Sequence, residues 1–120
     1  MNCLCGKKME KKSGQFGEYY RCVNYPECDI IYNIIYKQYS TQEERDARKK
    51  AHKHFDAIWK DGWMSRRNAY RLLSGIMRVK KEYAHIGLCN KAQCEEIIRV
   101  CDRKIKRMER KYGVKEKAQV

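Results

Sequence analysis

The sequence has 120 residues, enough for one small domain or two very small modules, and its 28 lysines and arginines outnumber its 15 acidic residues, giving a formal net charge of +13. This excess favours a polyanionic partner such as nucleic acid, and no stretch is apolar and long enough to span a bilayer, so we expect no membrane-spanning role. The seven cysteines are an odd number and no leader pattern is recognisable, which favours the cytoplasm and thiolates bound to a metal over a secreted disulfide scaffold.

Four of the cysteines form two close pairs near the N-terminus. Cys3-x-Cys5 is separated by sixteen residues from Cys22-x5-Cys28, and Gly6 can take the positive φ that a tight turn after the first pair needs. Two thiolate pairs supply the four soft ligands of a tetrahedral zinc site, and about thirty residues bury too little apolar surface to fold without such a metal. We therefore predict that Cys3, Cys5, Cys22 and Cys28 bind one structural zinc ion (Zn2+).

The same segment resembles a known zinc ribbon. Its motifs are Cys-x-Cys-Gly-x-x-Met, Gly-x-x-Gly-x-Tyr and Cys-x-x-Tyr-Pro-x-Cys, and they are similar to the zinc-ribbon repeats at the C-terminal end of type IA DNA topoisomerases. Those repeats usually begin Cys-Pro-x-Cys-Gly, whereas this chain is one residue shorter there and lacks the proline. The resemblance covers about the first thirty residues, and it implies a small β-ribbon that contacts single-stranded DNA.

Cations and aromatic rings alternate in this ribbon, as single-strand binding requires, with charge for phosphates and rings for stacked bases. The candidate nucleic-acid-binding residues here are Lys7, Lys8, Lys11, Lys12, Tyr19, Tyr20, Arg21 and Tyr25. The alternative is that the rings form the ribbon's own small core. Because neighbouring strand residues point to opposite faces, one of Tyr19 and Tyr20 can be core while the other faces a partner.

Downstream of the cysteines we expect one strand and three helices. Residues 29–39, β-branched and aromatic, predict a strand that completes the ribbon. Thr41 and Glu44 predict a capping box and a helix to about Lys60. Ser65 and Asn90 predict the N-caps of two further helices, the last ending at Gly113. The expected helical core is Phe55, Trp59, Tyr70, Leu73, Ile97 and Cys101.

The predicted fold class is therefore α+β, with a small zinc β-ribbon in residues 1–40 followed by a basic three-helix domain in residues 41–120. The motifs Ala-His-x-x-Phe-Asp-x-x-Trp, Met-Ser-Arg-x-x-Ala-Tyr and His-Ile-Gly with a later Cys lie between Ala51 and Ile98. They resemble the family called zinc-finger-containing domain, found in phages and bacteria, over most of residues 1–100. The resemblance implies this architecture and a phage or prophage source, but no known activity.

Most of the positive charge lies in the helical part, where residues 41–120 hold 22 basic and 11 acidic side chains. A compact cluster of Lys60, Arg66, Arg67 and Arg71 is predicted to contact phosphates without reading bases. The outer face of the third helix is also basic, through Arg103, Lys104, Arg107 and Lys111. That face is compatible with a membrane surface or a protein partner, although its apolar side favours packing on its own domain.

A second metal site and an active site are both disfavoured. The residues that invite a second metal are His52, His54, His85, Cys89, Cys94 and Cys101, but Cys94 and Cys101 lie on an apolar stripe where cysteine acts as a small hydrophobe. His52 and Asp56 are spaced to meet on one helix face, and a hydrogen-bonded pair that orients Trp59 is the simpler interpretation. No constellation meets the geometric test for catalysis, so we expect no enzyme; a hydrolase using His52, Asp56 and His85 is a minor hypothesis.

These patterns together predict a small cytoplasmic zinc protein that binds nucleic acid, DNA in preference to RNA, mainly through phosphates and without strong sequence specificity. We expect no small-molecule substrate. The alternative hypothesis is a phage-encoded interaction or inhibitor module that docks on a host or virion protein.

Overall fold

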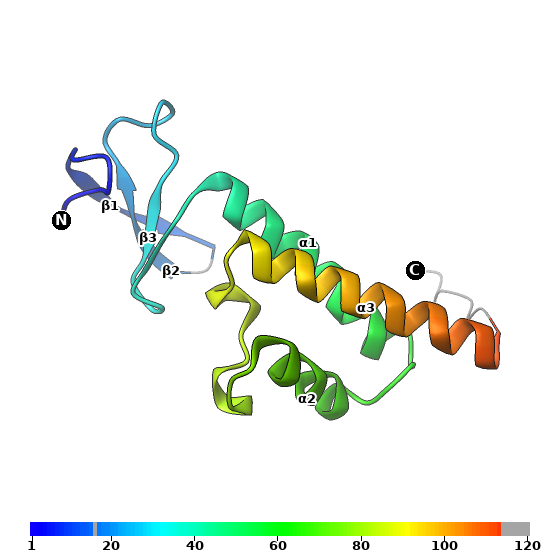
Figure 1. The fold of residues 1–120 in the computed structure, drawn as a ribbon. Coiled ribbons are helices and arrows are strands. Elements are labelled where there is room, and N and C mark those ends of the chain that lie inside the picture. The colour runs from blue at the N-terminus through cyan, green and yellow to red at the C-terminus, as the bar shows by residue number, and fades with distance from the viewer. Residues whose placement is uncertain (16, 114–120) are drawn as a thin grey trace. The chain divides into compact units, whose positions relative to one another are not determined.

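A four-stranded antiparallel sheet forms the N-terminal part of the computed structural model, which describes residues 1–15 and 17–113 (Figure 1). The strands are β1 (Met9–Gly14), β2 (Gly17–Cys22), β3 (Ile31–Asn33) and β4 (Gln38–Ser40), and they pair in that order. The longest pairing joins β1 to β2, from Met9 opposite Cys22 to Gly14 opposite Gly17. This hairpin carries the segment between the two cysteine pairs.

The single strand predicted for residues 29–39 is wrong, because the chain reverses inside it. The Asn33 side-chain oxygen accepts the backbone N–H of Tyr36 at 2.9 Å, and Lys37 takes a φ of 53°, so residues 34–37 form a turn between β3 and β4. An asparagine that bonds a backbone N–H further along the chain favours a turn over a continued strand. The apolar run therefore makes a second hairpin.

The N-terminal unit, Met1–Asp46, has a very small core. Among its described residues, the buried apolar side chains are Cys3, Met9 and Cys22. The partly buried residues packed on them are Tyr20, Cys28, Ile30, Tyr32 and Tyr39. Two of the three buried residues are predicted metal ligands, so little apolar surface remains to hold this unit together.

Three helices follow the sheet, and the predicted caps are confirmed. They are α1 (Gln42–Lys60), α2 (Arg66–Met77) and α3 (Lys91–Tyr112), with short 3-10 turns η1 (Lys81–Tyr83) and η2 (Ile86–Leu88) before α3. The Thr41 hydroxyl accepts the Glu44 N–H at 3.2 Å and the Glu44 carboxylate accepts the Thr41 N–H at 3.1 Å, a reciprocal capping box. Ser65 caps α2, Asn90 caps α3 in a second capping box, and α3 ends before Gly113. The α+β architecture is as the sequence predicts.

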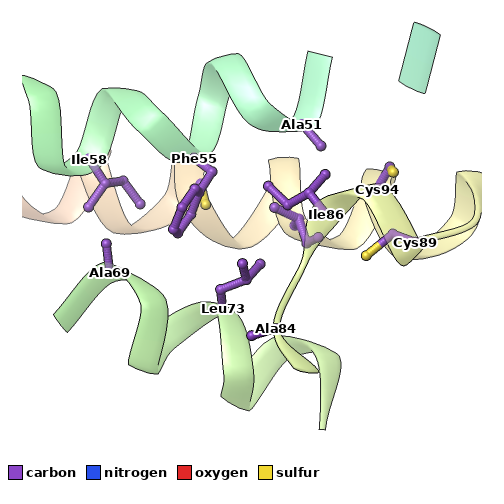
Figure 2. Close-up of a cluster of buried hydrophobic side chains, with 11 residues drawn as sticks. Ala51, Phe55, Ile58, Ala69, Leu73, Ala84, Ile86, Cys89 and Cys94 are labelled. Atoms are coloured by element: carbon purple, nitrogen blue, oxygen red, sulfur yellow. The ribbon is translucent and has the colours of Figure 1, made fainter. Parts of the chain in front are cut away.

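The second unit begins at Ala47 and is built around one apolar core. Figure 2 shows Phe55 and Ile58 of α1 directed toward Ala69 and Leu73 of α2, and Ala51 of α1 near Ile86. The remaining buried members are Ala84, Ile86, Cys89, Cys94, Ile97 and Cys101. Of the predicted core, Phe55, Leu73, Ile97 and Cys101 are fully buried, whereas Trp59 and Tyr70 pack on its edge and stay partly exposed.

None of the helices in the described part of the chain is both long enough and apolar enough to cross a membrane.

Candidate metal centre and basic surfaces

Two tight turns present the four N-terminal cysteines. In the first, the Cys3 N–H donates to the Lys7 carbonyl at 2.7 Å and the Gly6 N–H to the Cys3 carbonyl at 3.0 Å. Gly6 takes a φ of 92°, in the region that only glycine adopts without strain. In the second, the Cys28 N–H donates to the Asn24 carbonyl at 3.1 Å. Each pair is thus held on its own backbone loop, as in zinc knuckles.

The four sulfur atoms have the spacing of one tetrahedral zinc site. All of them lie within 4.8 Å of one another. The Cys3 and Cys28 sulfurs are 3.7 Å apart and the Cys5 and Cys22 sulfurs 3.5 Å apart. A tetrahedron with Zn–S bonds of about 2.3 Å requires sulfur–sulfur distances of about 3.8 Å, whereas a disulfide requires about 2.05 Å. The cluster fits one structural zinc ion bound by Cys3, Cys5, Cys22 and Cys28.

The surroundings of these thiols differ, and so do their pKa values before a metal binds. Burial raises the pKa of Cys22 to about 12 and also raises the pKa of Cys3. The backbone N–H of Lys7 lowers the pKa of the exposed Cys5 to about 7. Because zinc binds thiolates, loading the site displaces a proton from the buried ligands.

The β-sheet register separates the aromatic candidates onto two faces. Tyr20 lies opposite Tyr32 and Tyr32 opposite Tyr39, with ring centroids 6.4 Å and 4.9 Å apart, and all three pack on the zinc-bearing core. Tyr19 is on the other face, in register with Lys12. The structure therefore gives Tyr20 a packing role and leaves Tyr19 directed away from that core.

The ribbon cations are in unequal environments. Lys11 pairs with Glu18 at 3.0 Å and Lys12 with Glu10 at 3.3 Å, whereas no ion pair engages Lys7 or Lys8 in residues 1–15 and 17–113.

The other ribbon cation stacks on a ring. The Arg21 guanidinium lies 4.6 Å from the ring centroid of Tyr25, which is 53% exposed. An arginine stacked on an exposed ring keeps its N–H edge available for a phosphate.

A second cationic surface lies where α1 ends and α2 begins. The Arg66 guanidinium lies 5.5 Å from the Trp59 ring centroid and 5.1 Å from that of Tyr70, and the Lys60 ammonium lies 5.4 Å from Trp59. The predicted cations Arg67 and Arg71 are exposed on the same first turns of α2. We call Trp59, Lys60, Arg66, Arg67, Tyr70 and Arg71 the aromatic corner.

The sequence pattern placed Trp59 and Tyr70, the two rings of the aromatic corner, in the core and did not identify them as surface residues. Trp59 donates its indole N–H to Asp56 at 3.2 Å, and Tyr70 meets Phe55 edge-to-face with centroids 5.1 Å apart. Each ring is therefore partly buried and partly exposed, as is common for amphipathic rings. The spacing of Arg66 four residues before Tyr70 was the available signal.

The histidines of α1 are used differently from the predicted His52–Asp56 pair. Asp56 accepts from Trp59 and pairs with Lys60 at 3.6 Å. His54 Nδ1 lies 2.7 Å from the Asp102 carboxylate of α3 and joins the two helices.

The three C-terminal cysteines belong to the helical core. Cys89, Cys94 and Cys101 are fully buried, and burial raises the pKa of Cys89 to about 11 and that of Cys101 to about 12. Within residues 1–15 and 17–113, the only group of three or more metal-ligating side chains is the N-terminal cysteine cluster.

Comparison with known proteins agrees with this centre. The family described as zinc-finger-containing domain matches residues 4–104, which hold most of both units and three of the four clustered cysteines. No curated protein and no solved structure matches the chain.

Proposed function

Because the chain belongs to the zinc-finger-containing domain family, we propose that it is a zinc-stabilised nucleic-acid-binding protein that contacts phosphates and single-stranded bases without strong sequence specificity. DNA is the preferred ligand, since the ribbon motifs resemble those of DNA topoisomerases. The family resemblance supports a phage or prophage origin and a role in the host cytoplasm. The proposal assigns no catalytic group.

The observation that carries the proposal is the aromatic corner. Arg66 is held over two rings, and in the described residues no carboxylate pairs with Arg66, Arg67 or Arg71. Stacking restrains the guanidinium, so less side-chain entropy is lost when it donates to a phosphate. Partly exposed tryptophan and tyrosine rings beside unpaired cations are the combination that single-stranded nucleic acid needs.

The ribbon supplies a second set of the same chemistry. Lys7, Lys8 and Arg21 carry charge, and Tyr19 and Tyr25 offer rings away from the zinc core. Ring stacking contributes about 1–3 kcal/mol per base in single-strand binders, so even one such ring adds measurable affinity.

A titration of the zinc-loaded protein with labelled single-stranded DNA at several salt concentrations tests the proposal. Arg66→Gln with Arg71→Gln should lower the affinity at least tenfold and reduce the slope of log K against log salt by about 1.4, or about 0.7 per phosphate contact. The matched control is Lys49→Gln with Lys53→Gln, which removes the same charge from exposed positions of α1. Arg66→Lys keeps the charge but not the planar stack, so its affinity should fall between the two.

Equal losses in the corner and control variants would refute the assignment of the aromatic corner. Wild-type binding that disappears at physiological salt for every nucleic acid would refute the proposed function as a whole.

The alternative, a protein-docking module, is favoured by one observation. Leu4 and Ile35 of the N-terminal unit are 68% and 72% exposed, so two large apolar side chains are accessible to a protein partner. Docking on a host or virion protein would depend on a few such residues, so Ile35→Ser would abolish capture of that partner and leave DNA binding unchanged.

A further inference from the structure

The solvent side of α3 carries a straight row of cations, Arg99, Arg103, Lys106 and Arg110. At about 100° per residue these four positions fall within about 60° of one another around the helix axis. All four are exposed, and together with Asp102 they line a shallow depression on the helix surface. From Arg99 to Arg110 the helix rises about 16 Å, so the row presents about one cation per turn. We call these four residues the α3 row.

Most of the α3 row is uncompensated. Arg99 pairs with Glu96, but no carboxylate pairs with Arg103, Lys106 or Arg110 in the part of the chain that the structure describes. Among the acidic residues beside the row, Glu96 is taken up by Arg99 and Asp102 is engaged by His54 of α1. A second depression, lined by Arg103, Arg107, Arg110 and Lys111, continues the positive surface toward the end of the helix.

The chemistry around the α3 row excludes two kinds of ligand. The apolar stripe of α3, with Cys94, Ile97 and Cys101, is buried in the core on the opposite side, so no apolar face is left to enter a bilayer. The row contains no aromatic ring, so it offers nothing on which an unpaired base could stack. What remains is a surface for a dense line of anions.

We infer that the α3 row binds the sugar-phosphate backbone of double-stranded nucleic acid. It would be a second binding surface in addition to the aromatic corner. Duplex DNA carries about one charge per 1.7 Å of axis, twice the density of one strand, and its bases are already stacked inside. A rigid row of cations without rings therefore gains more binding free energy from a duplex than from a single strand. This inference rests on the proposed function, because it assigns the duplex to α3 and the single strand to the aromatic corner.

The test is a salt-dependent titration of the zinc-loaded full chain with a labelled DNA duplex and with one of its strands. The row variant is Arg103→Gln, Lys106→Gln and Arg110→Gln; the matched control is Lys49→Gln, Lys50→Gln and Lys53→Gln, three exposed cations of α1. Glutamine has nearly the same helix propensity as lysine and arginine, so both variants should fold, which zinc content and thermal unfolding verify.

The row variant should lose at least 30-fold in duplex affinity, with its salt slope smaller by about 2.7, while its single-strand affinity changes by less than about threefold. The control should change the duplex slope by less than about 1. Equal duplex losses in both variants would overturn the inference, because net charge alone would explain them.

The inference and the proposed function fail in different ways. Wild-type protein that binds the single strand but not the duplex would overturn the α3 assignment and leave the aromatic corner intact. Protein that binds neither ligand at physiological salt would overturn both.

Discussion

Removing zinc should unfold the N-terminal unit and leave the helical unit folded. The described residues of the first unit include three buried apolar side chains, and two of them, Cys3 and Cys22, are zinc ligands. Among the described residues of this unit, Met9 is the only buried apolar side chain that is not a zinc ligand, and burying a methionine contributes about 1.5–3 kcal/mol. Ordering the backbone of one or two residues costs as much. A structural zinc in a small domain contributes about 10–16 kcal/mol, several times the contribution of the buried Met9 side chain.

Hydrogen exchange resolved by peptide would measure this. After chelation, the amides of β1 and β2 should exchange within seconds, while those in the middle of α1 and α3 should keep their protection, since the helical core contains no metal ligand. Cys22→Ser should reproduce the effect without a chelator, and Cys101→Ala, which leaves the four ligands intact, is the control. Protected β2 amides in metal-free protein would refute the reasoning.

Three further outcomes follow from the same contacts. Leu73→Ala should destabilise the helical unit by about 2–5 kcal/mol in a denaturant titration without releasing zinc, because Leu73 is fully buried away from the ligands. None of the seven cysteines should react with a thiol reagent in the zinc-loaded protein at pH 8, whereas four should react after chelation and all seven after denaturation. The three core cysteines stay unreactive until denaturation because burial keeps the pKa of Cys89 at about 11 and that of Cys101 at about 12. Reaction of these three before denaturation would contradict their place in the core. Competition with a chromophoric chelator should show zinc affinity falling by at least about tenfold per pH unit below pH 7. The reason is that zinc must displace the proton from Cys22, whose metal-free pKa is about 12. A pH-independent affinity would show instead that the Cys22 thiol is already ionised.

The features that could be predicted from the sequence are those that depend on neighbours along the chain. The cysteine spacing identifies the zinc ligands because each pair belongs to a single turn. The caps at Thr41, Ser65 and Asn90 mark the helix starts because a side chain bonds a backbone N–H three residues away. The prediction of one strand through Asn33 was wrong because it relied on the run of apolar residues and overlooked a local turn signal, the asparagine side chain that accepts the Tyr36 N–H.

The features that only the tertiary structure decided depend on residues far apart in the chain. Strand register sends Tyr20 to the zinc core and Tyr19 to the other face, although the two are neighbours. Packing of α1 against α2 leaves Trp59 at the edge of the core under Arg66, where periodicity alone placed it inside.

The basic surface of α3 likewise depends partly on the sequence and partly on the tertiary structure. The sequence alone determined that this protein is basic and that most of its positive charge lies in residues 41–120. Burial of Cys94, Ile97 and Cys101 then decided which side of α3 faces solvent, and so selected Arg99, Arg103, Lys106 and Arg110 from its many cations. A helix has apolar and charged positions in its sequence, but only the neighbours that cover its apolar side determine which charges a partner can reach.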